Sequence, residues 1–202
     1  MSVAANAWIT LAQFKAYAGI VSTDATRDAM IEPIIDGVSV ALSAFCGREI
    51  AKTTYTNEYI DGNGERDLLL PNYPIVSVSA ITENDVSLTE GTTEDYILYA
   101  KEGRLARIDG SWYPFPKSIK LTYIAGYTVQ GTSPGTGETA LPADLALACK
   151  LQVAAEWKRS SRAEWGLTNI SINDGSIATL ANEALLPQVK AILRRHTGVM
   201  AG

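Results

Sequence analysis

Residues 24–48 read DATRDAMIEPIIDGVSVALSAFCGR, and this stretch decides the fold that we expect for the chain. Its large apolar side chains recur every three or four residues, at Ile31, Ile34, Ile35, Val38, Leu42 and Phe45. This spacing places one apolar stripe along a helix, which is typical of a helix that packs on a core. Asp24 is expected to cap the start of the helix, and Gly47 to end it in a left-handed turn.

Two residues within this stretch oppose helix formation. Pro33 costs about 3 kcal/mol inside a helix and Gly37 about 1 kcal/mol. Burial of the six apolar side chains contributes on the order of 10 kcal/mol, which outweighs both. The sequence therefore predicts one long helix kinked near residues 29–33, or two helices that meet there.

Composition limits the class of protein. The chain has 202 residues, 47% of them hydrophobic, which is enough for a sizeable core. No run approaches the roughly 18 uncharged apolar residues of a membrane span, and no basic-then-apolar leader is evident, so we expect a soluble protein made in a cytoplasm. A net charge of −5 argues against a broad grip on DNA. Cys46 and Cys149 are expected to be buried free thiols rather than a disulfide.

Further helices are predicted on both sides of the chain's middle. Thr10 is expected to cap a short helix, Leu11–Tyr17, that is closed by Gly19 and lies against the long helix. A helix beginning near residues 141–144 carries a stripe of smaller residues, with Gln152 and Glu156 beside it, and is expected to pair with the long helix. Residues 168–180 predict a short hairpin and 187–196 a last helix, with Val189, Ile192 and Leu193 inward.

The period changes from 3.6 to 2 near residue 50. Residues 53–60 and 67–70 flank the turn sequence Asp61-Gly62-Asn63-Gly64, which predicts a hairpin. Further short strands are predicted at 75–81, 86–88, 96–99, 105–108 and 119–124. The fold class is therefore α+β, a helical bundle with an inserted antiparallel sheet or small sandwich of about five to seven strands. We expect one domain, 1–202, with helical parts 8–48 and 141–197, a β-rich insertion 50–129, a flexible loop 130–140 and a tail 198–202.

The sequence offers few candidates for catalytic or metal-binding residues. His196 is the chain's one histidine, and the end of a helix is a poor place for a catalytic triad, so it is interpreted as capping helix carbonyls. One histidine and two distant cysteines do not favour zinc. Glycines 131–137 are not followed by the lysine of a phosphate-binding loop. We expect no enzyme activity and no cofactor.

A run of oxygen-bearing side chains has the alternation of a calcium loop: Asp61, Asn63, Glu65 and Asp67. However, Arg66 and Asn72 stand where an EF-hand requires glycine and glutamate. A turn with solvated acids is therefore favoured, and no metal is expected.

Two stretches allow an interaction role. Residues 111–116, SWYPFP, either plug the end of the sheet with aromatic side chains or present Trp112, Tyr113 and Phe115 to a partner. Residues 158–165, KRSSRAEW, either complement the dipole of a helix end or make a subunit contact. An alternative function is a monomeric ligand- or protein-binding module that uses the Trp112/Tyr113/Phe115 loop.

The order of several motifs resembles a known family. These motifs are ITLAQFKAY (9–17), FCGR (45–48), EYIDGNG (58–64), LLLPNYPI (68–75), LPADL (141–145) and LPQVKAIL (186–193). Together they are similar to the head–tail connector, or adaptor, proteins of tailed bacteriophages, in the longer form with a β insertion. The resemblance covers most of the chain.

The resemblance implies a structural virion protein at the head–tail junction, assembled in the cytoplasm of the bacterial host. It implies a ring, usually of twelve copies, that docks on the portal and receives tail-terminator, stopper or other neck proteins. DNA would pass through the lumen, and no membrane is involved. The residues then expected to bind the portal are Pro187, Lys190, Leu193, Arg194, Arg195, His196, Val199 and Met200. Those expected to contact other subunits or the tail are Asp61, Asn63, Trp112, Tyr113, Phe115, Arg159, Arg162 and Trp165.

Overall fold

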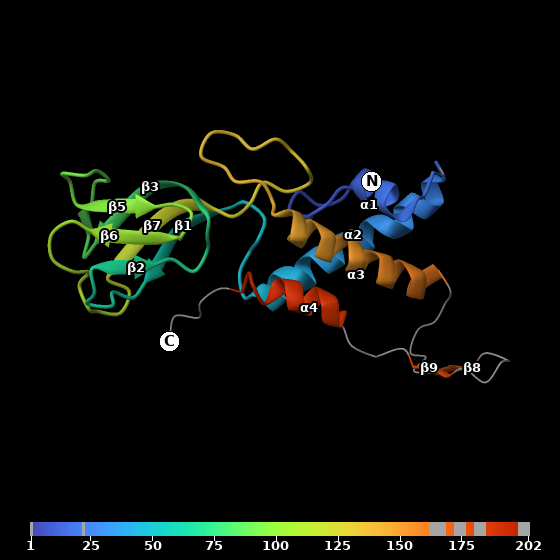
Figure 1. Cartoon of the computed structure of the whole chain (residues 1–202). Helices are drawn as coiled ribbons and strands as arrows, with labels where there is room; N and C mark the ends of the chain where they lie inside the picture. Colours follow the sequence, from blue (N-terminus) through green and yellow to red (C-terminus); the bar gives the residue numbers. More distant parts are fainter. Residues whose placement is uncertain (1, 22, 162–168, 172–176, 180–184, 198–202) are drawn as a thin grey trace. The chain divides into compact units, whose positions relative to one another are not determined.

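The computed structural model describes residues 2–21, 23–161, 169–171, 177–179 and 185–197. The chain forms two compact units, each described by itself below. The helical unit consists of Met1–Leu42 and Pro142–His196, and the β unit of Ser43–Leu141 with Thr197–Gly202. Helices and antiparallel sheets occur together, which confirms the predicted α+β class (Figure 1). The finer domain boundaries remain a prediction.

The first helix, α1 (Leu11–Ala18), has the predicted ends. The Thr10 side chain accepts a hydrogen bond from the Gln13 amide at 3.1 Å, and the Gln13 side chain accepts one from the Thr10 amide at 2.9 Å. This reciprocal pair satisfies two amides that a helix start leaves open. Gly19 closes the helix with φ +67°. The ion pair between Lys15 and Asp28, at 2.9 Å, ties α1 to the second helix as expected.

The second helix, α2 (Ala25–Cys46), is one helix with Pro33 inside it, so the alternative of two helices is wrong. Asp24 Oδ1 accepts a hydrogen bond from the Thr26 amide at 2.9 Å, and Gly47 follows the helix with φ +67°, as predicted. Among the described helices, α2 is long and apolar enough to cross a membrane by length and composition alone, with a mean hydropathy of 1.5. About half of it is buried within the protein, as in a core helix.

The third helix, α3 (Ala143–Ser161), packs on α2 as predicted, and Ser39 Oγ lies 3.9 Å from Cys149 Sγ at their contact. Cys46 and Cys149 are both buried free thiols, which confirms that prediction, and burial raises the pKa of Cys149 to about 12. Gln152 was expected beside the apolar stripe, but it is buried. Its side chain donates a hydrogen bond to Glu156 and accepts one from the Leu186 amide, both at 3.0 Å. These bonds satisfy the polar groups of Gln152, which allows its burial.

The C-terminal part contains a small hairpin and a short helix. Strands β8 (Asn169–Ser171) and β9 (Ile177–Thr179) pair antiparallel, as the sequence predicts for this region. Helix α4 (Pro187–Leu193) is shorter than the predicted 187–196. Its residues Val189 and Leu193 are fully buried, and α4 contacts α3.

The β unit holds a four-stranded sheet in the order β1-β7-β3-β4 and a three-stranded sheet in the order β2-β6-β5. The first sheet consists of β1 (Thr53–Ile60), β7 (Ile119–Ala125), β3 (Ile75–Glu83) and β4 (Val86–Ser87). The second consists of β2 (Asp67–Leu69), β6 (Arg104–Arg107) and β5 (Tyr96–Tyr99). Both contribute to one apolar core, with Leu68 and Leu105 from the smaller sheet and Ile81, Leu121 and Tyr123 from the larger. The predicted small sandwich is therefore confirmed.

The predicted hairpin between residues 53–60 and 67–70 is wrong. β1 pairs with β7, and β2 pairs with β6 in the other sheet. The turn sequence at 61–64 carries the chain from one sheet to the other instead. Its residues bond to a distant loop, because the Gly62 amide donates to the Phe115 carbonyl at 3.1 Å.

The loop 130–140 is tied to the β unit through Glu138. Its carboxylate accepts hydrogen bonds from Lys52 Nζ at 2.5 Å, Thr128 Oγ1 at 2.7 Å and the Gly135 amide at 3.0 Å. The flexibility predicted for this loop remains a prediction, but its C-terminal end is fixed by these contacts.

Candidate interaction surfaces

The aromatic loop, residues 109–118, connects β6 to β7. Trp112 is fully buried in the core of the sandwich, whereas Tyr113 and Phe115 are 51% and 58% exposed. The rings of these two residues lie 6.1 Å apart. Trp112 therefore packs into the sheet core, as the first of the two interpretations of this stretch predicts. The prediction that Trp112 is presented to a partner is wrong. Tyr113 and Phe115 form an exposed aromatic pair.

A partly buried ion pair fixes the beginning of the aromatic loop. Arg107 Nη2 lies 2.7 Å from Glu83 Oε2, and the two side chains are only 16% and 11% exposed. The other oxygen of Glu83 accepts a hydrogen bond from the Tyr113 amide at 2.7 Å. The Arg107 guanidinium also lies over the Trp112 ring, 5.2 Å from its centre. One carboxylate thus joins the end of β3 to the aromatic loop.

The turn after β1 holds the other end of the loop. Asp61 Oδ1 accepts a hydrogen bond from the Lys117 amide at 2.7 Å. A Cβ atom at Gly62 would lie 1.8 Å from the Tyr113 carbonyl oxygen, so only glycine fits there. The aromatic pair is consequently presented on a backbone held from two sides. Preorganisation of this kind lowers the entropy lost on binding.

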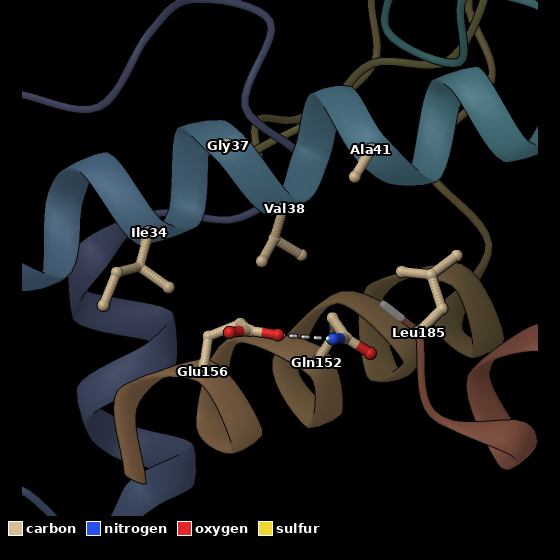
Figure 2. A pocket seen from close by; sticks show the side chains of 7 residues that line it. All are labelled: Ile34, Gly37, Val38, Ala41, Gln152, Glu156 and Leu185. Carbon is tan, nitrogen blue, oxygen red and sulfur yellow. Dashed lines mark hydrogen bonds between the residues drawn. The ribbon is translucent and has the colours of Figure 1, made fainter. Parts of the chain in front are cut away.

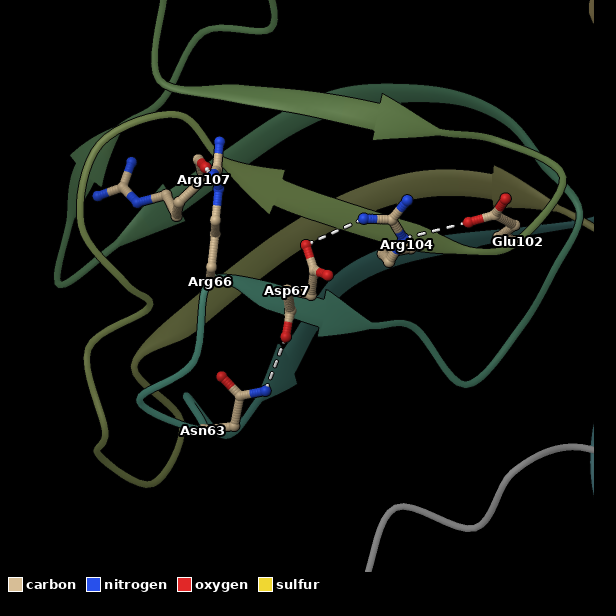
Figure 3. Close-up of polar contacts among 6 residues, drawn as sticks. All are labelled: Asn63, Arg66, Asp67, Glu102, Arg104 and Arg107. Atoms are coloured by element: carbon tan, nitrogen blue, oxygen red, sulfur yellow. Dashed lines mark hydrogen bonds and ion pairs between the residues drawn. The ribbon is translucent and has the colours of Figure 1, made fainter.

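Asn63 and Asp67, two residues of the run at 61–67, form hydrogen bonds and an ion pair within the β unit (Figure 3). The Asn63 amide group donates to the Asp67 carbonyl at 2.8 Å, and Arg104 pairs with Asp67 at 3.0 Å and Glu102 at 3.1 Å. Asp61 and Asn63 are exposed, and their contact with another subunit or the tail remains a prediction. In the part of the chain that the structure describes, no group of three or more His, Cys, Asp or Glu side chains could hold a metal ion.

Helix α4 divides the predicted portal-binding residues into two sets. Pro187, Arg194 and Arg195 are exposed and Lys190 is half-buried, and their contact with the portal remains a prediction. Leu193 is fully buried, so its predicted contact with a partner is wrong for α4 as it is packed here. Val199 and Met200 lie outside the described residues.

The ring of His196 contacts α3, which the interpretation of His196 as a cap of helix carbonyls did not include. Nε2 of His196 lies 2.8 Å from Oδ2 of Asp144, in the first turn of α3. Partial burial would raise the pKa of Asp144, but the hydrogen bond and charge of His196 lower it overall. The pair fastens the end of α4 to the start of α3. Nothing in the sequence spacing, 52 positions, indicates it.

The C-terminal end of α3 is only partly described. Arg159 pairs with Glu156 at 3.1 Å, three residues earlier on the same helix. Arg162 and Trp165, the other residues predicted to contact a subunit there, lie outside the described residues. Their role remains a prediction.

The sequence reading missed a pocket in the helical unit (Figure 2). It has a volume of about 270 Å³ and lies between α2 and α3. Ile34, Gly37 and Ala41 form its wall on α2, and Gln152 and Glu156 its polar side on α3. The sequence contains the spacing of three and four residues between these α2 positions, but from the sequence alone Pro33 and Gly37 indicate only a cost to the helix.

The fold is α+β, and its exposed features include an aromatic pair on a fixed loop. The family model for the head completion protein family matches residues 7–199, so the chain belongs to this family. The predicted relation to phage head–tail connector proteins is thereby confirmed, and the chain is a structural protein of a phage-like head–tail junction.

Solved structures share the fold. A chain in the neck of an empty gene transfer agent (GTA) particle, computed with C6 symmetry, matches with a TM-score of 0.57 and 17% identity over 100% of this chain and 97% of that one. A chain in the virion of a native GTA particle matches with a TM-score of 0.55 and 17% identity, over 100% of this chain and 96% of that one. A chain in the neck of a native GTA particle, computed with C12 symmetry, matches with a TM-score of 0.50 and 15% identity, over 100% of this chain and 98% of that one. No curated protein sequence matches.

Proposed function

We propose that the protein forms a ring at the head–tail junction, docks on the portal, and connects it to tail-terminator, stopper or other neck proteins. DNA passes through the lumen of the ring. The observation that carries this proposal is the family match over residues 7–199. The shared fold with chains from the necks of GTA particles supports it, since those necks were computed with C6 and C12 symmetry. Twelve copies is the number that we propose, with assembly in the bacterial host cytoplasm.

The exposed residues divide into two proposed contacts. The C-terminal segment, with Pro187, Lys190, Arg194, Arg195 and the outlying Val199 and Met200, binds the portal. Because a closed ring needs two different patches that meet, other surfaces must serve neighbouring copies or the tail. We assign this role to the Tyr113–Phe115 pair with Asp61 and Asn63, and to the end of α3 with Arg159, Arg162 and Trp165.

The aromatic pair is the stronger of these contact surfaces. Tyr113 and Phe115 are exposed, adjacent and held by the Glu83 and Asp61 hydrogen bonds. Buried aromatic side chains concentrate binding energy at protein interfaces, and truncation of such a residue costs about 2 kcal/mol or more. The acidic balance of the chain, −5, is consistent with a lumen that lets DNA pass without gripping it.

The test mixes the purified protein with purified portal and images the particles. We expect a ring of the protein on one end of the portal. A chain truncated after Leu186 should fail to dock, and circular dichroism must show that it remains folded, because α4 packs on α3. A Tyr113→Ala/Phe115→Ala variant should lose contacts to neighbours or tail proteins but retain its fold. Particles that lack the protein yet join tails normally would refute the proposal.

A further inference from the structure

The pocket between α2 and α3 opens on an exposed side of α2 (Figure 2). Gly37 and Ala41 line the pocket and are themselves exposed. From residue 30 to residue 44, about 20 Å of helix, every exposed residue of α2 is apolar or glycine. These residues are Met30, Pro33, Gly37, Val40, Ala41 and Ala44. A helix side of this length without an exposed charge is typical of a surface that another protein covers.

The pocket has the size and the chemistry of a site for an aromatic ring. Its volume is about 270 Å³, and a cavity of about 150 Å³ in a protein core is large enough for benzene. Ile34, Val38 and Leu185 give it apolar walls, and Glu156 lies at its polar side. An aromatic side chain that ends in a hydrogen-bond donor would satisfy both parts.

The aromatic pair of the β unit offers such groups. Phe115 is wholly apolar, and Tyr113 ends in a hydroxyl that can donate a hydrogen bond to a carboxylate. Both rings are more than half exposed, and their loop is held by hydrogen bonds to Glu83 and Asp61. The two rings can therefore enter a pocket of another molecule with little loss of entropy.

A carboxylate lies beside the aromatic pair and a guanidinium beside the pocket. Glu65 is exposed, and its carbonyl accepts a hydrogen bond from the Trp112 amide at 2.9 Å, which holds this turn against the aromatic loop. Arg159 follows Glu156 by three residues on the same side of α3. It donates to Glu156 through Nη1 alone, at 3.1 and 3.3 Å, so within the described residues its Nε and Nη2 keep N–H groups for another carboxylate.

We propose that the pocket receives Tyr113 and Phe115 of a neighbouring copy of this chain. The Tyr113 hydroxyl donates to Glu156, and the Glu65 carboxylate pairs with Arg159. This inference rests on the proposed function, because it specifies how one subunit of the ring contacts the next.

A second copy is favoured over other occupants. A closed ring needs two different patches that meet, and this chain carries both the exposed rings and a pocket of matching size and charge. A small ligand would fill the pocket but leave the apolar side of α2 in water, whereas a second subunit covers both.

The decisive variant is Ala41→Leu, with Ala16→Leu as its matched control. Both make the same change at an exposed position of a helix, but only Ala41 lines the pocket. The protein is titrated onto purified portal, and particle imaging gives the concentration at which half of the portals carry a ring. We expect this concentration to rise about tenfold or more for Ala41→Leu and to stay within about twofold for Ala16→Leu. Phe115→Ala should act like the former, and Tyr59→Ala, a ring 56% exposed elsewhere on the β unit, like the latter.

An exchange of charges tests the pairing of Glu65 with Arg159. Glu65→Arg and Arg159→Glu should each weaken ring formation about fivefold, because like charges then face each other. The variant with both changes should recover most of the loss, since opposite charges meet again. Circular dichroism checks that each variant is folded. Losses that simply add in the double variant would overturn the proposal.

A chemical cross-link shows which chains meet. The variant Ala41→Cys/Pro116→Cys, treated with a short bismaleimide on the portal, should give a ladder of linked subunits, because each copy contacts the next. Wild type, whose two cysteines are buried, and Ala16→Cys/Pro116→Cys should give none.

Three results would overturn the inference and leave the proposed function in place. One is a complete ring without the ladder, and another is a link within single chains only, because the rings would then occupy their own pocket. The third is a complete Phe115→Ala ring that fails to join tails, since the aromatic pair would then bind a tail protein. If the wild type forms no ring on the portal, the proposed function itself fails, and this inference with it.

Discussion

Nε2 of His196 lies 2.8 Å from Oδ2 of Asp144, so a residue at the end of α4 is bound to the first turn of α3. The carboxylate also lies near the positive end of the α3 dipole, which favours its ionised form. This relationship joins two segments that the sequence separates by 52 positions. It gives the helical unit a pH-dependent contact.

The first prediction concerns acid stability. Because the folded pKa of Asp144 is lowered, its contribution to stability is complete above its ordinary pKa, near 4, and is lost as pH falls through the lowered value. Asp144→Asn should therefore lower the free energy of unfolding by up to about 1 kcal/mol near neutral pH, since the side chain is 37% exposed. Urea unfolding at pH 6 and pH 3 measures this. A difference that grows in acid would contradict the assignment.

The second prediction compares two glycines. At Gly62 a Cβ atom would lie 1.8 Å from the Tyr113 carbonyl oxygen, so Gly62→Ala should destabilise the β unit by about 1–3 kcal/mol. At Gly37, inside α2, a Cβ atom would meet nothing within 4 Å. Gly37→Ala should instead stabilise the protein by up to about 1 kcal/mol, because alanine is the better helix former. Urea unfolding gives the free energy of unfolding of both variants. Equal changes would contradict the difference in space around the two glycines.

The third prediction separates Trp112 from its exposed neighbour. Trp112→Ala removes a fully buried ring and should cost about 3–5 kcal/mol of stability. Tyr113→Ala removes a ring that is half in solvent and should change stability by less than about 0.5 kcal/mol. Chemical unfolding, followed by tryptophan fluorescence for the tyrosine variant and by circular dichroism for both, gives the two values. Comparable losses would show that Tyr113 also belongs to the core.

The fourth prediction concerns the partly buried ion pair between Arg107 and Glu83. Arg107→Ala leaves the Glu83 carboxylate with the Tyr113 amide as its described partner, which should cost about 1–3 kcal/mol. The double variant Glu83→Leu/Arg107→Leu should cost less, because no charge is left buried. A double-mutant cycle that also includes Glu83→Leu and Arg107→Leu, read by urea unfolding, measures the coupling. Additive losses would mean that the two side chains act independently.

The fifth prediction concerns the loop 130–140. Hydrogen bonds from Lys52, Thr128 and the Gly135 amide lower the pKa of Glu138 to about 2. The stabilisation is therefore present above the ordinary glutamate pKa, near 4.3, and is lost as pH falls from there toward 2. Glu138→Gln should speed hydrogen exchange at the Thr128 and Leu141 amides, which bond across the base of this loop. Glu94→Gln, in another exposed turn, is the control and should leave these amides unchanged.

Local structure could be predicted from the sequence because its causes are local. The apolar stripe of residues 24–48 specified α2, and Thr10, Asp24, Gly19 and Gly47 marked helix ends through bonds or backbone angles within a few residues. Alternation of polar and apolar residues located the strands. The motif order also led to the correct family, since it reflects the succession of elements along the chain.

Tertiary structure alone decided which elements are partners. An alternating pattern says which face of a strand is buried but not which strand lies beside it, so the pairing of β1 with β7 could not be read from the turn at 61–64. The same holds for the burial of Trp112, the Glu83–Arg107 pair and the Asp144–His196 contact. Each depends on residues far apart in the chain, whose meeting is set by packing of the whole unit. Such contacts cannot be predicted from the spacing of residues along the sequence.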